Sequence, residues 1–303
     1  MRLASWNIRG VNHPSKQQVV RHFLLKHRVD VMGMVETRVK VHNDGIIEAK
    51  LFGHNWGLAN NYQFHPNGII WLAWNKARIR MEVLHSSAQM ITGVVDSGFC
   101  SFWLSVVDGL NSRAERQELW HDLASLSSGC SVPWILMGDF NVVLHDDEKK
   151  SAGMFDHGSI RDFGDCCQSL QLMDLPYQGV FYSWSINQFA DARTWCKLDR
   201  VMGNCAWFHA SWDVQVDFLE PGISDHSPIV VASTLPAPPQ HRQFRFLNCW
   251  AADSGFLPLV ATAWPTNAIG CPMFRLITRL KQVKAGLKEL HRTSYPNVSD
   301  RVA

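Results

Sequence analysis

No run of apolar residues in this 303-residue sequence approaches the roughly 20 that a membrane-spanning helix needs. A strand-like stretch begins at Arg2, which leaves no room for an amino-terminal targeting signal. The eight cysteines include no Cys-x-x-Cys pair and no Cys/His set with the spacing of a zinc site. These absences argue against a membrane protein and favour a reducing compartment, so we expect a nuclear or cytoplasmic protein.

Two common enzyme signatures and a strong net charge are also missing. The sequence has neither the Gly-x-x-x-x-Gly-Lys loop of P-loop NTPases nor the Gly-x-Ser-x-Gly turn of α/β-hydrolases. The net charge is only +2, but residues 236–303 carry nine Lys or Arg and three Asp or Glu, whereas residues 1–235 carry 20 and 24. An acidic body repels phosphodiesters unless metal cations mediate the contact, so the charge favours metal-assisted chemistry on such substrates.

The first 235 residues combine many apolar strands with a few helices. Helices are predicted at 14–27, 112–126 and 158–170, and strands at 2–7, 29–35, 69–74, 79–84, 90–95, 99–107, 134–139, 181–184, 198–201, 214–219 and 229–231. In the first helix, the predicted buried face holds Val19, Val20, Phe23, Leu24 and His27. Ser112 and Glu115 have the spacing of a capping box. Strands in runs broken by helices predict an α+β sandwich of two packed mixed sheets with helices outside.

The character of the chain changes at residue 235. Leu-Pro-Ala-Pro-Pro at 235–239 predicts a stiff linker between a domain at 1–235 and a basic helical tail at 236–303. The tail has a helical apolar stripe formed by Leu276, Leu280, Val283, Leu287 and Leu290. Such a stripe is not buried by one helix alone, so we expect it to pack on the body or on a partner.

Polar residues follow the apolar strands at several places. In the stretch 134–141, period-2 geometry places Asp139 and Asn141 on one side of the chain and Phe140 on the other. An ordinary Asx turn explains the same residues about equally well. The full set of polar residues at strand ends is Asn7, Glu36, Asp139, Asn141, Asp199, Asp225 and His226.

Each of these residues has a structural alternative that is favoured when it is taken alone. Asn7 is placed to cap a turn, Glu36 to pair with Arg38, and Asp199 to pair with Arg200. Residues 224–228 are compatible with an ordinary loop that enters a strand. Because a sandwich brings its strand ends together, we nevertheless expect the whole set to converge at one rim.

The set suits metal-assisted phosphodiester hydrolysis. Mg²⁺ prefers oxygen ligands and keeps several waters, so a few protein ligands suffice. We expect Glu36 to be the main ligand, with Asn7 and Asp225 completing the shell. We expect Asp139 to orient or deprotonate the attacking water. His226 would hold a phosphate oxygen, with its tautomer fixed by Asp199. Asn141 would donate an amide hydrogen bond to the phosphate.

Five ordered motifs resemble those of the endonuclease/exonuclease/phosphatase superfamily. They are Ser5-Trp-Asn-Ile-Arg-Gly10, Val35-Glu-Thr-Arg38, Met137-Gly-Asp-Phe-Asn141, Lys197-Leu-Asp-Arg200 and Ser224-Asp-His-Ser-Pro228. The resemblance covers residues 1 to about 233. It implies a four-layer αββα sandwich of the deoxyribonuclease-I type, dependence on Mg²⁺ or Mn²⁺, and nicking of DNA.

Within that superfamily, the chain is most similar to the endonuclease domains of plant LINE-type (non-LTR) retrotransposons. Residues 244–295 resemble the segment that precedes reverse transcriptase in those polyproteins, so a reverse transcriptase module absent from this chain is an expected partner beside DNA. Abasic-site repair enzymes of the superfamily carry an acid where this chain has Arg9. The resemblance therefore favours a retrotransposon-type endonuclease over a repair enzyme.

One position departs from the family pattern. The family strand before Gly109 normally ends in a Tyr whose phenol donates to the scissile phosphate, and this chain has Asp108 there. Loss of one such donor typically costs on the order of 10²–10³ in rate. A negative charge about 4 Å from a phosphate adds about 4 kcal/mol at an effective dielectric of about 20. We therefore predict a folded nuclease domain with weak or undetectable activity, in preference to recruitment of a second cation by Asp108.

Two other functions stay open at this point. One is a non-catalytic nucleic-acid-binding remnant that keeps the fold and uses the basic tail. The other is a phosphatase that acts on a small phosphate ester. The sequence predicts neither a target-site preference nor an oligomeric state.

Overall fold

The structure is a computed structural model of the chain. It describes residues 1–151, 155–186, 193–210, 212–233, 246, 248–251, 253–264 and 269–294. The chain divides into two compact units, Met1–Pro236 and Ala237–Ala303. Residues 235–239, where the sequence predicts a stiff linker, lie outside the described residues.

Seven strands form the first sheet of unit 1, in the order β11–β15–β16–β1–β2–β4–β3. Their bounds are β1 Arg2–Asn7, β2 Val31–Val35, β3 Trp56–Asn60, β4 Trp71–Asn75, β11 Tyr177–Gly179, β15 Val214–Phe218 and β16 Ile229–Ser233. The sheet is mixed, because β1 pairs parallel with β2 and antiparallel with β16.

Six strands form the second sheet, in the order β10–β14–β8–β7–β6–β5. They are β5 Arg80–Ser86, β6 Met90–Asp96, β7 Ser101–Asp108, β8 Trp134–Asp139, β10 Met173–Asp174 and β14 Asp199–Gly203. A small third sheet contains β9 Lys149–Lys150, β12 Trp184–Ser185 and β13 Trp195–Cys196. β7 and β8 are parallel, whereas β14 runs antiparallel to β8.

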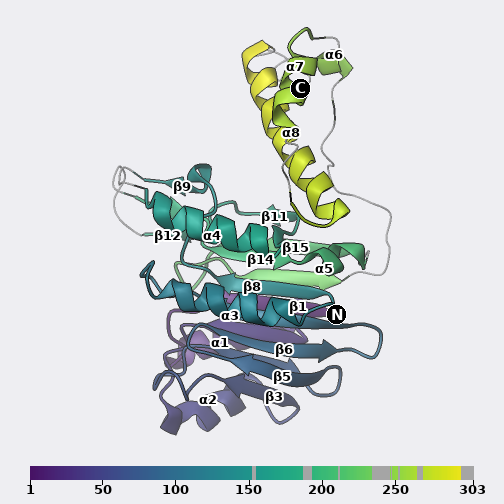
Figure 1. Ribbon diagram of the computed structural model, residues 1–303. Coiled ribbons are helices and arrows are strands. Elements are labelled where there is room, and N and C mark those ends of the chain that lie inside the picture. Colours follow the sequence, from purple (N-terminus) through teal and green to yellow (C-terminus); the bar gives the residue numbers. More distant parts are fainter. Residues whose placement is uncertain are drawn as a thin grey trace. The chain divides into compact units, whose positions relative to one another are not determined.

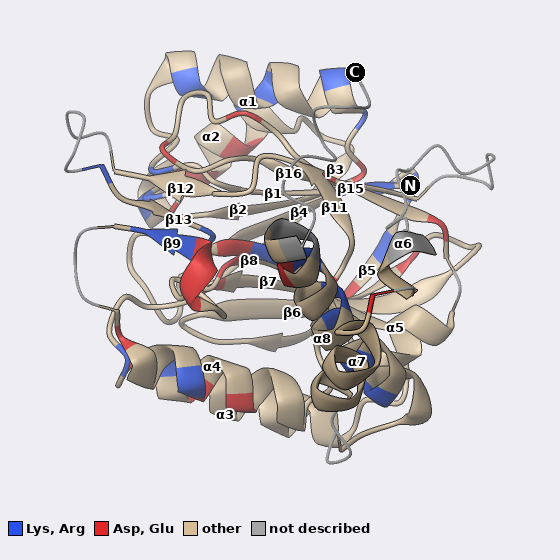
Figure 2. Ribbon diagram, turned by 90° about the horizontal axis from the view of Figure 1, so that it is seen from above, with Lys and Arg blue, Asp and Glu red and all other residues tan. Residues whose placement is uncertain are grey.

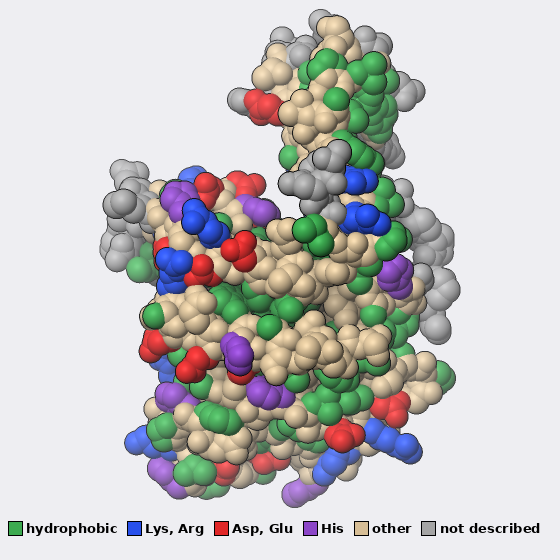
Figure 3. Space-filling model, in the orientation of Figure 1, with side chains coloured by type: hydrophobic (Ala, Val, Ile, Leu, Met, Phe, Trp, Pro, Cys, Tyr) green, Lys and Arg blue, Asp and Glu red, His purple; other side chains and the backbone are tan. Residues whose placement is uncertain are grey.

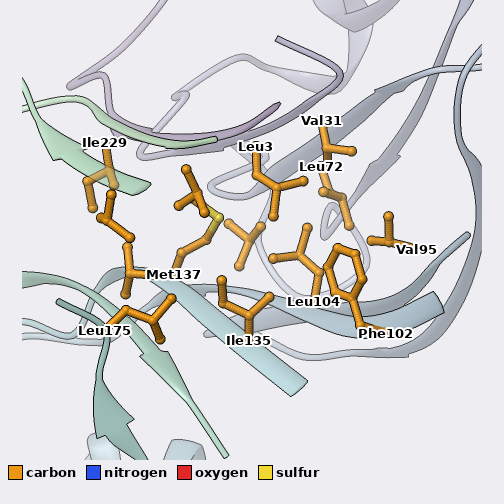
Figure 4. Packing of buried hydrophobic residues seen from close by; sticks show 14 of the residues in the cluster. Leu3, Val31, Leu72, Val95, Phe102, Leu104, Ile135, Met137, Leu175 and Ile229 are labelled. Atoms are coloured by element: carbon orange, nitrogen blue, oxygen red, sulfur yellow. The ribbon is translucent and has the colours of Figure 1, made fainter. Parts of the chain in front are cut away.

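The two large sheets pack face to face through alternate residues of their strands. In β8, Ile135 and Met137 belong to the core between the sheets, whereas Trp134 and Leu136 belong to the core beneath the helices. Figure 4 shows Ile135 and Met137 facing residues of the first sheet such as Leu3. Both faces of β8 are therefore buried, which explains why its sequence is a continuous apolar run.

Helices cover the outer face of each sheet (Figures 1 and 2). α1 (Pro14–His27) and α2 (Asp44–Leu51) lie on the first sheet, and α3 (Arg116–Ser128) and α4 (His157–Ser169) lie on the second. Shorter helices are η1 (Val41–Asn43), η2 (Asp146–Glu148) and α5 (Cys205–His209). On the face shown in Figure 3, acidic, basic and histidine side chains are intermixed over β9 and α4. The arrangement confirms the predicted α+β, four-layer αββα fold.

The structure corrects the sequence analysis at four places. Of the strand predicted at 181–184, only Trp184 is in a strand, the two-residue β12. Val19 of α1 is 38% exposed, whereas the buried face contains Gln17, because Gln17 donates to the Val11 and Asn12 carbonyls. The predicted capping box at Ser112 is absent: α3 begins later, with Glu115 at the N-cap and no side-chain cap. Sequence periodicity also missed α2, whose eight residues are too few for a clear helical pattern.

Unit 2 is helical in its described part, with α6 (Asn248–Ala251), α7 (Phe256–Ala263) and α8 (Pro272–Ser294). α7 packs on α8 so closely that a Cβ at Gly286 would lie 2.9 Å from a Leu259 methyl carbon. Along the predicted stripe, Leu287 is buried and Leu276 and Leu280 are exposed. Across the described residues, every helix is too short or too polar to span a membrane.

Candidate active site

Strand pairing brings the predicted residues to one rim of unit 1. In the first sheet, Asn7 pairs in register with Val35, so Asn7 lies beside Glu36, the residue after β2. In the second sheet, Asp139 pairs with Asp108 on one side and with Asp199 on the other. We name the set at this rim the rim cluster: Asn7, Glu36, Asp108, Asp139, Asp199, Asp225 and His226. The expected convergence is confirmed by the contacts that follow.

Asn7 links the two sheets. Its side-chain Nδ2 donates to Glu36 Oε1 at 3.0 Å and to Asp139 Oδ2 at 2.9 Å. Its Oδ1 accepts from the Arg9 backbone N–H at 3.2 Å, so the turn-capping alternative also applies. Asn7 is fully buried. It therefore holds a carboxylate of each sheet in place and faces both of them with its nitrogen.

Asp139 and Asn141 differ from the period-2 expectation. The strand ends at Asp139, and Asn141 has φ 50°, in the left-handed region. The Asn141 N–H donates to Asp139 Oδ1 at 2.8 Å, which is the Asx turn, and its Nδ2 donates to the Gly109 carbonyl at 2.7 Å. Asn141 therefore ties two loops together beside the cleft.

Gly138 allows β7 and β8 to approach closely just before Asp139. Its φ is +137°, and a Cβ there would lie 2.1 Å from the Val107 carbonyl oxygen. Any other residue would clash with β7. In this motif, Gly138 therefore permits the close packing of the two strands, and Asp139 contributes its carboxylate to the site.

His226 lies between two carboxylates of the second sheet. Its Nδ1 donates to Asp199 Oδ2 at 2.9 Å and lies 3.6 Å from Asp139 Oδ2. Burial lowers the pKa of His226, but the charges of Asp199 and Asp139 outweigh it and raise the pKa to about 9. Among the described residues, the buried Nε2 has no hydrogen-bond partner. The Nε2–H of the imidazolium therefore has no hydrogen-bond acceptor among the described residues.

Burial lowers the pKa of a histidine but raises the pKa of a carboxylic acid, because it disfavours the charged form of each. It is the main cause that raises the pKa of Asp139, and it raises the pKa of Asp108 well above its usual value, with repulsion from Asp139 and Glu36 adding to it. Three acids so close together disfavour full ionisation of the set. A bound cation would relieve this repulsion.

Several positioning residues were missed by the sequence analysis. Trp184 Nε1 donates to Asp225 Oδ2 at 2.9 Å, and the Ser224 hydroxyl donates to the Asn7 carbonyl at 2.6 Å. Ser183 Oγ accepts from the Asp199 N–H at 2.8 Å. Trp184 lies 41 residues from Asp225 and Ser183 lies 16 residues from Asp199, so no local spacing assigns either of them a role. Ser224 lies within a quoted motif, but its partner is distant in the sequence.

The structural alternatives for two acids have different outcomes. Glu36 pairs with Arg38, as that alternative proposed, and also with Arg9 at 3.4 Å. Asp199 pairs with His226, whereas its neighbour Arg200 bonds Asp174 and Glu148. β14 alternates its side chains, so Asp199 and Arg200 face opposite sides.

A cleft of about 320 Å³ opens beside the rim cluster. Its lining includes Glu36, Asp108, Asn111 and Asn141 together with Arg9 and Arg38. Asp108 is only 7% exposed, so its carboxyl forms part of the floor. A ligand in this cleft would meet acids at its base and arginines at its edge.

One part of the rim cluster has the geometry of a metal site. Side-chain ligand atoms of Glu36, Asp139 and His226 all lie within 4.8 Å of one another. The two carboxylates suit a divalent cation, whereas His226 would offer a ligand nitrogen only after losing the proton that its raised pKa favours. Of the predicted metal ligands, Glu36 belongs to this group, while Asp225 is bonded to Arg9 and Trp184.

Three similar solved structures have titles that name a nuclease or a DNA product. The 3′–5′ exonuclease NExo of Neisseria meningitidis matches with a TM-score of 0.57 and 17% identity, covering 78% of this chain and 100% of that one. The endonuclease domain of TRAS1, a telomere-specific non-LTR retrotransposon, matches with a TM-score of 0.57 and 10% identity over 78% and 99%. D. rerio TDP2 with a single-strand DNA product matches with a TM-score of 0.52 and 14% identity over 76% and 97%.

These likenesses define the class of fold, a sandwich shared by nucleases and phosphatases. A family model matches residues 4–226, and the chain therefore belongs to the Endonuclease/Exonuclease/phosphatase family. No curated relative matches the chain. Enzymes of this family generally depend on a divalent metal, and the cluster of Glu36, Asp139 and His226 could bind one.

Proposed function

We propose that this chain is a Mg²⁺- or Mn²⁺-dependent phosphodiesterase that nicks DNA, as a retrotransposon-type endonuclease weakened by Asp108. The family match supports the phosphoesterase part of the proposal, and the titles of the similar structures support DNA as the substrate class. The plant LINE-type assignment rests on segments 115–120, 146–149 and 179–184, which resemble those endonuclease domains, and on Arg9, and the likeness to the TRAS1 domain is compatible with it.

The bound metal would neutralise the rim acids and polarise a phosphate oxygen. Glu36 would be its main ligand, with Asn7 and Asp225 nearby. Asn7 now presents Nδ2 to Glu36, so ligation through Oδ1 requires its amide to turn. Asp225 is held by Arg9 and Trp184, which keeps its carboxylate at the edge of the same site.

The chain's own residues would act on water and phosphate. Asp139, whose raised pKa makes it a better proton acceptor, would orient the attacking water and take its proton. His226 would donate from Nε2 to a phosphate oxygen, because Asp199 occupies Nδ1. Asn141 would donate to phosphate only after its Nδ2 leaves the Gly109 carbonyl.

The observation that carries the proposal is the unused Nε2 of His226. A buried N–H without an acceptor is costly, so native proteins rarely keep one without a reason. Here it belongs to an imidazolium fixed by Asp199 and lies beside Asp139. A phosphate oxygen is an acceptor of the right charge for that position.

A plasmid-nicking assay tests the proposal. Supercoiled DNA is incubated with the full chain in Mg²⁺ or Mn²⁺, and relaxed circles are counted over time. We expect slow nicking that Glu36→Ala abolishes, because the main metal ligand is lost. Glu82→Ala is the matched control, since Glu82 is an exposed carboxylate on edge strand β5. Equal nicking by both variants would contradict the proposal.

The two alternative functions are tested by the nicking assay together with a DNA-affinity measurement and a phosphatase assay. No nicking by the wild-type chain or by Asp108→Tyr, with salt-dependent DNA affinity retained, would favour a non-catalytic nucleic-acid-binding protein. Hydrolysis of p-nitrophenyl phosphate without nicking would favour a phosphatase acting on small esters.

A further inference from the structure

Arg9 has an unusually fixed backbone at the edge of the rim cluster. Its φ is 49°, in the left-handed region, and its N–H donates to Asn7 Oδ1 at 3.2 Å. The Lys16 ammonium donates to the Arg9 carbonyl at 3.0 Å and to the Ile8 carbonyl at 2.8 Å. Both sides of the peptide are therefore held, and the side chain leaves the backbone in a set direction.

The Arg9 guanidinium lies between two carboxylates of the rim. Its Nε donates to Asp225 Oδ1 at 3.1 Å, and its Nη1 lies 3.4 Å from Glu36 Oε1. These carboxylates come from opposite ends of the domain sequence. The guanidinium thus bridges the acids that the proposed function assigns to a divalent metal.

Arg38 contacts the same site in a different way. Among the described residues, its ion pair is with Glu36 Oε2, and its side chain is 53% exposed, against 36% for Arg9. An ion pair that is more exposed is more strongly screened by water and salt. Of the two arginines, Arg9 is therefore the stronger counter-charge to the acids.

We propose that Arg9 is a resident cation of the site, which a divalent metal must displace from Glu36 and Asp225 in order to bind. The inference rests on the proposed function, because it takes these carboxylates as metal ligands. A ligand oxygen that accepts from a guanidinium has less electron density to offer a metal, and two positive charges cannot occupy the same few ångströms without repulsion. Arg9 consequently weakens metal binding at the site.

The test measures Mn²⁺ affinity without any measurement of catalysis. Free hexaaqua Mn²⁺ gives an electron paramagnetic resonance signal that is lost on binding, so a titration gives a dissociation constant. We expect Arg9→Gln to tighten Mn²⁺ binding about fivefold, the scale of one to two partly exposed ion pairs. Arg38→Gln should tighten it less, by about twofold.

A matched control removes the same charge elsewhere. Arg80 is exposed at the start of β5, at the end of that strand away from the cleft. The opposite end of the strand, Ser86, leads to Ala88 in the cleft lining. Arg80→Gln should leave the dissociation constant unchanged. Arg9→Lys keeps the charge but loses the planar bridge, and it should give a value between wild type and Arg9→Gln.

The outcomes separate this inference from the proposed function. If Glu36→Ala abolishes Mn²⁺ binding but Arg9→Gln leaves it unchanged or weaker, the metal site stands and the role of Arg9 is overturned. If Glu36→Ala leaves binding intact, the metal assignment itself falls. If circular dichroism shows that Arg9→Gln does not fold, the Mn²⁺ dissociation constant of Arg9→Lys is compared with that of the wild-type chain instead. Binding by Arg9→Lys that is unchanged or weaker would then overturn the role of Arg9.

Discussion

Two buried clusters of charged side chains in the described part of unit 1 are built on opposite principles. The first, here the ion-pair cluster, comprises Glu148, Asp174, Lys197 and Arg200. Two acids meet two bases: Arg200 bonds Asp174 at 2.8 Å and also Glu148, and Lys197 bonds Asp174 at 3.0 Å. The rim cluster instead gathers five acids around a single histidine, with arginines only at its edge.

The pKa directions express this difference. In the ion-pair cluster, burial opposes ionisation of Glu148, but Arg200 and Lys197 outweigh it and lower the pKa. In the rim cluster, burial raises the pKa of Asp139 and Asp108, and nearby acids add to the effect. A balanced cluster neutralises its own charge within the protein, whereas an acid-rich cluster keeps a negative charge that a bound cation could neutralise. Charge balance therefore separates these two clusters more clearly than burial does.

The largest expected effect comes from breaking the balanced cluster. Arg200→Met leaves Glu148 and Asp174 with Lys197 as their shared base. Loss of one partner of a buried ion pair typically destabilises by about 3–5 kcal/mol. We expect urea unfolding to report a loss of this size. Arg113→Met, which breaks an exposed pair with Asp162, should have a much smaller effect. A similar midpoint for both variants would show that the ion-pair cluster is not structural.

The next effect tests the charge on His226. A histidine whose folded pKa is about 9, against about 6.5 unfolded, stabilises the protein fully below pH 6.5, and the contribution is lost as pH rises to about 9. In EDTA, between pH 7 and 9.5, the wild-type chain should lose about 2 kcal/mol more of its unfolding free energy than His226→Gln. Parallel pH curves for the two proteins would mean that His226 is not held as an imidazolium.

A smaller effect is expected from a substitution that places at the rim the phenol that the family pattern has there. Asp108→Tyr removes a buried acid and places a donor at the cleft floor, where about 320 Å³ of space is available. The gain in the nicking rate should be about 10²-fold, the usual value of one transition-state donor. Asp108→Phe has the same ring without the hydroxyl and should gain much less. A rate for Asp108→Tyr no higher than wild type would show that this position does not face the phosphate.

Sequence patterns predicted the strands and the convergence of their ends because both follow from local rules. Buried strands such as 134–139 are apolar runs, and a sandwich aligns the residues that follow them. Sequence reasoning failed where the outcome depended on long-range partners. The left-handed Asn141 and the bridging Arg9 are defined by contacts with residues that are distant in the chain, such as Gly109 and Asp225.

The electrostatic character of the site was equally hidden in the sequence. Arg200 was a candidate partner of Asp199, but strand alternation sends it to Glu148 instead. The sequence predicted that Asp199 would fix the tautomer of His226, and the two side chains are bonded, but it gave no sign that Asp139 would lie 3.6 Å from the same nitrogen. The sequence thus identified the residue types and two of their pairings, His226 with Asp199 and Glu36 with Arg38, and the fold determined the others.

Calorimetric titration of the full chain with Mg²⁺ tests the central claim that the rim cluster is completed by a cation. We expect binding to one site in the wild-type chain, none in Glu36→Ala, and unchanged binding in Glu82→Ala. Absence of Mg²⁺ and Mn²⁺ binding in the wild-type chain, or binding that survives Glu36→Ala, would contradict the account.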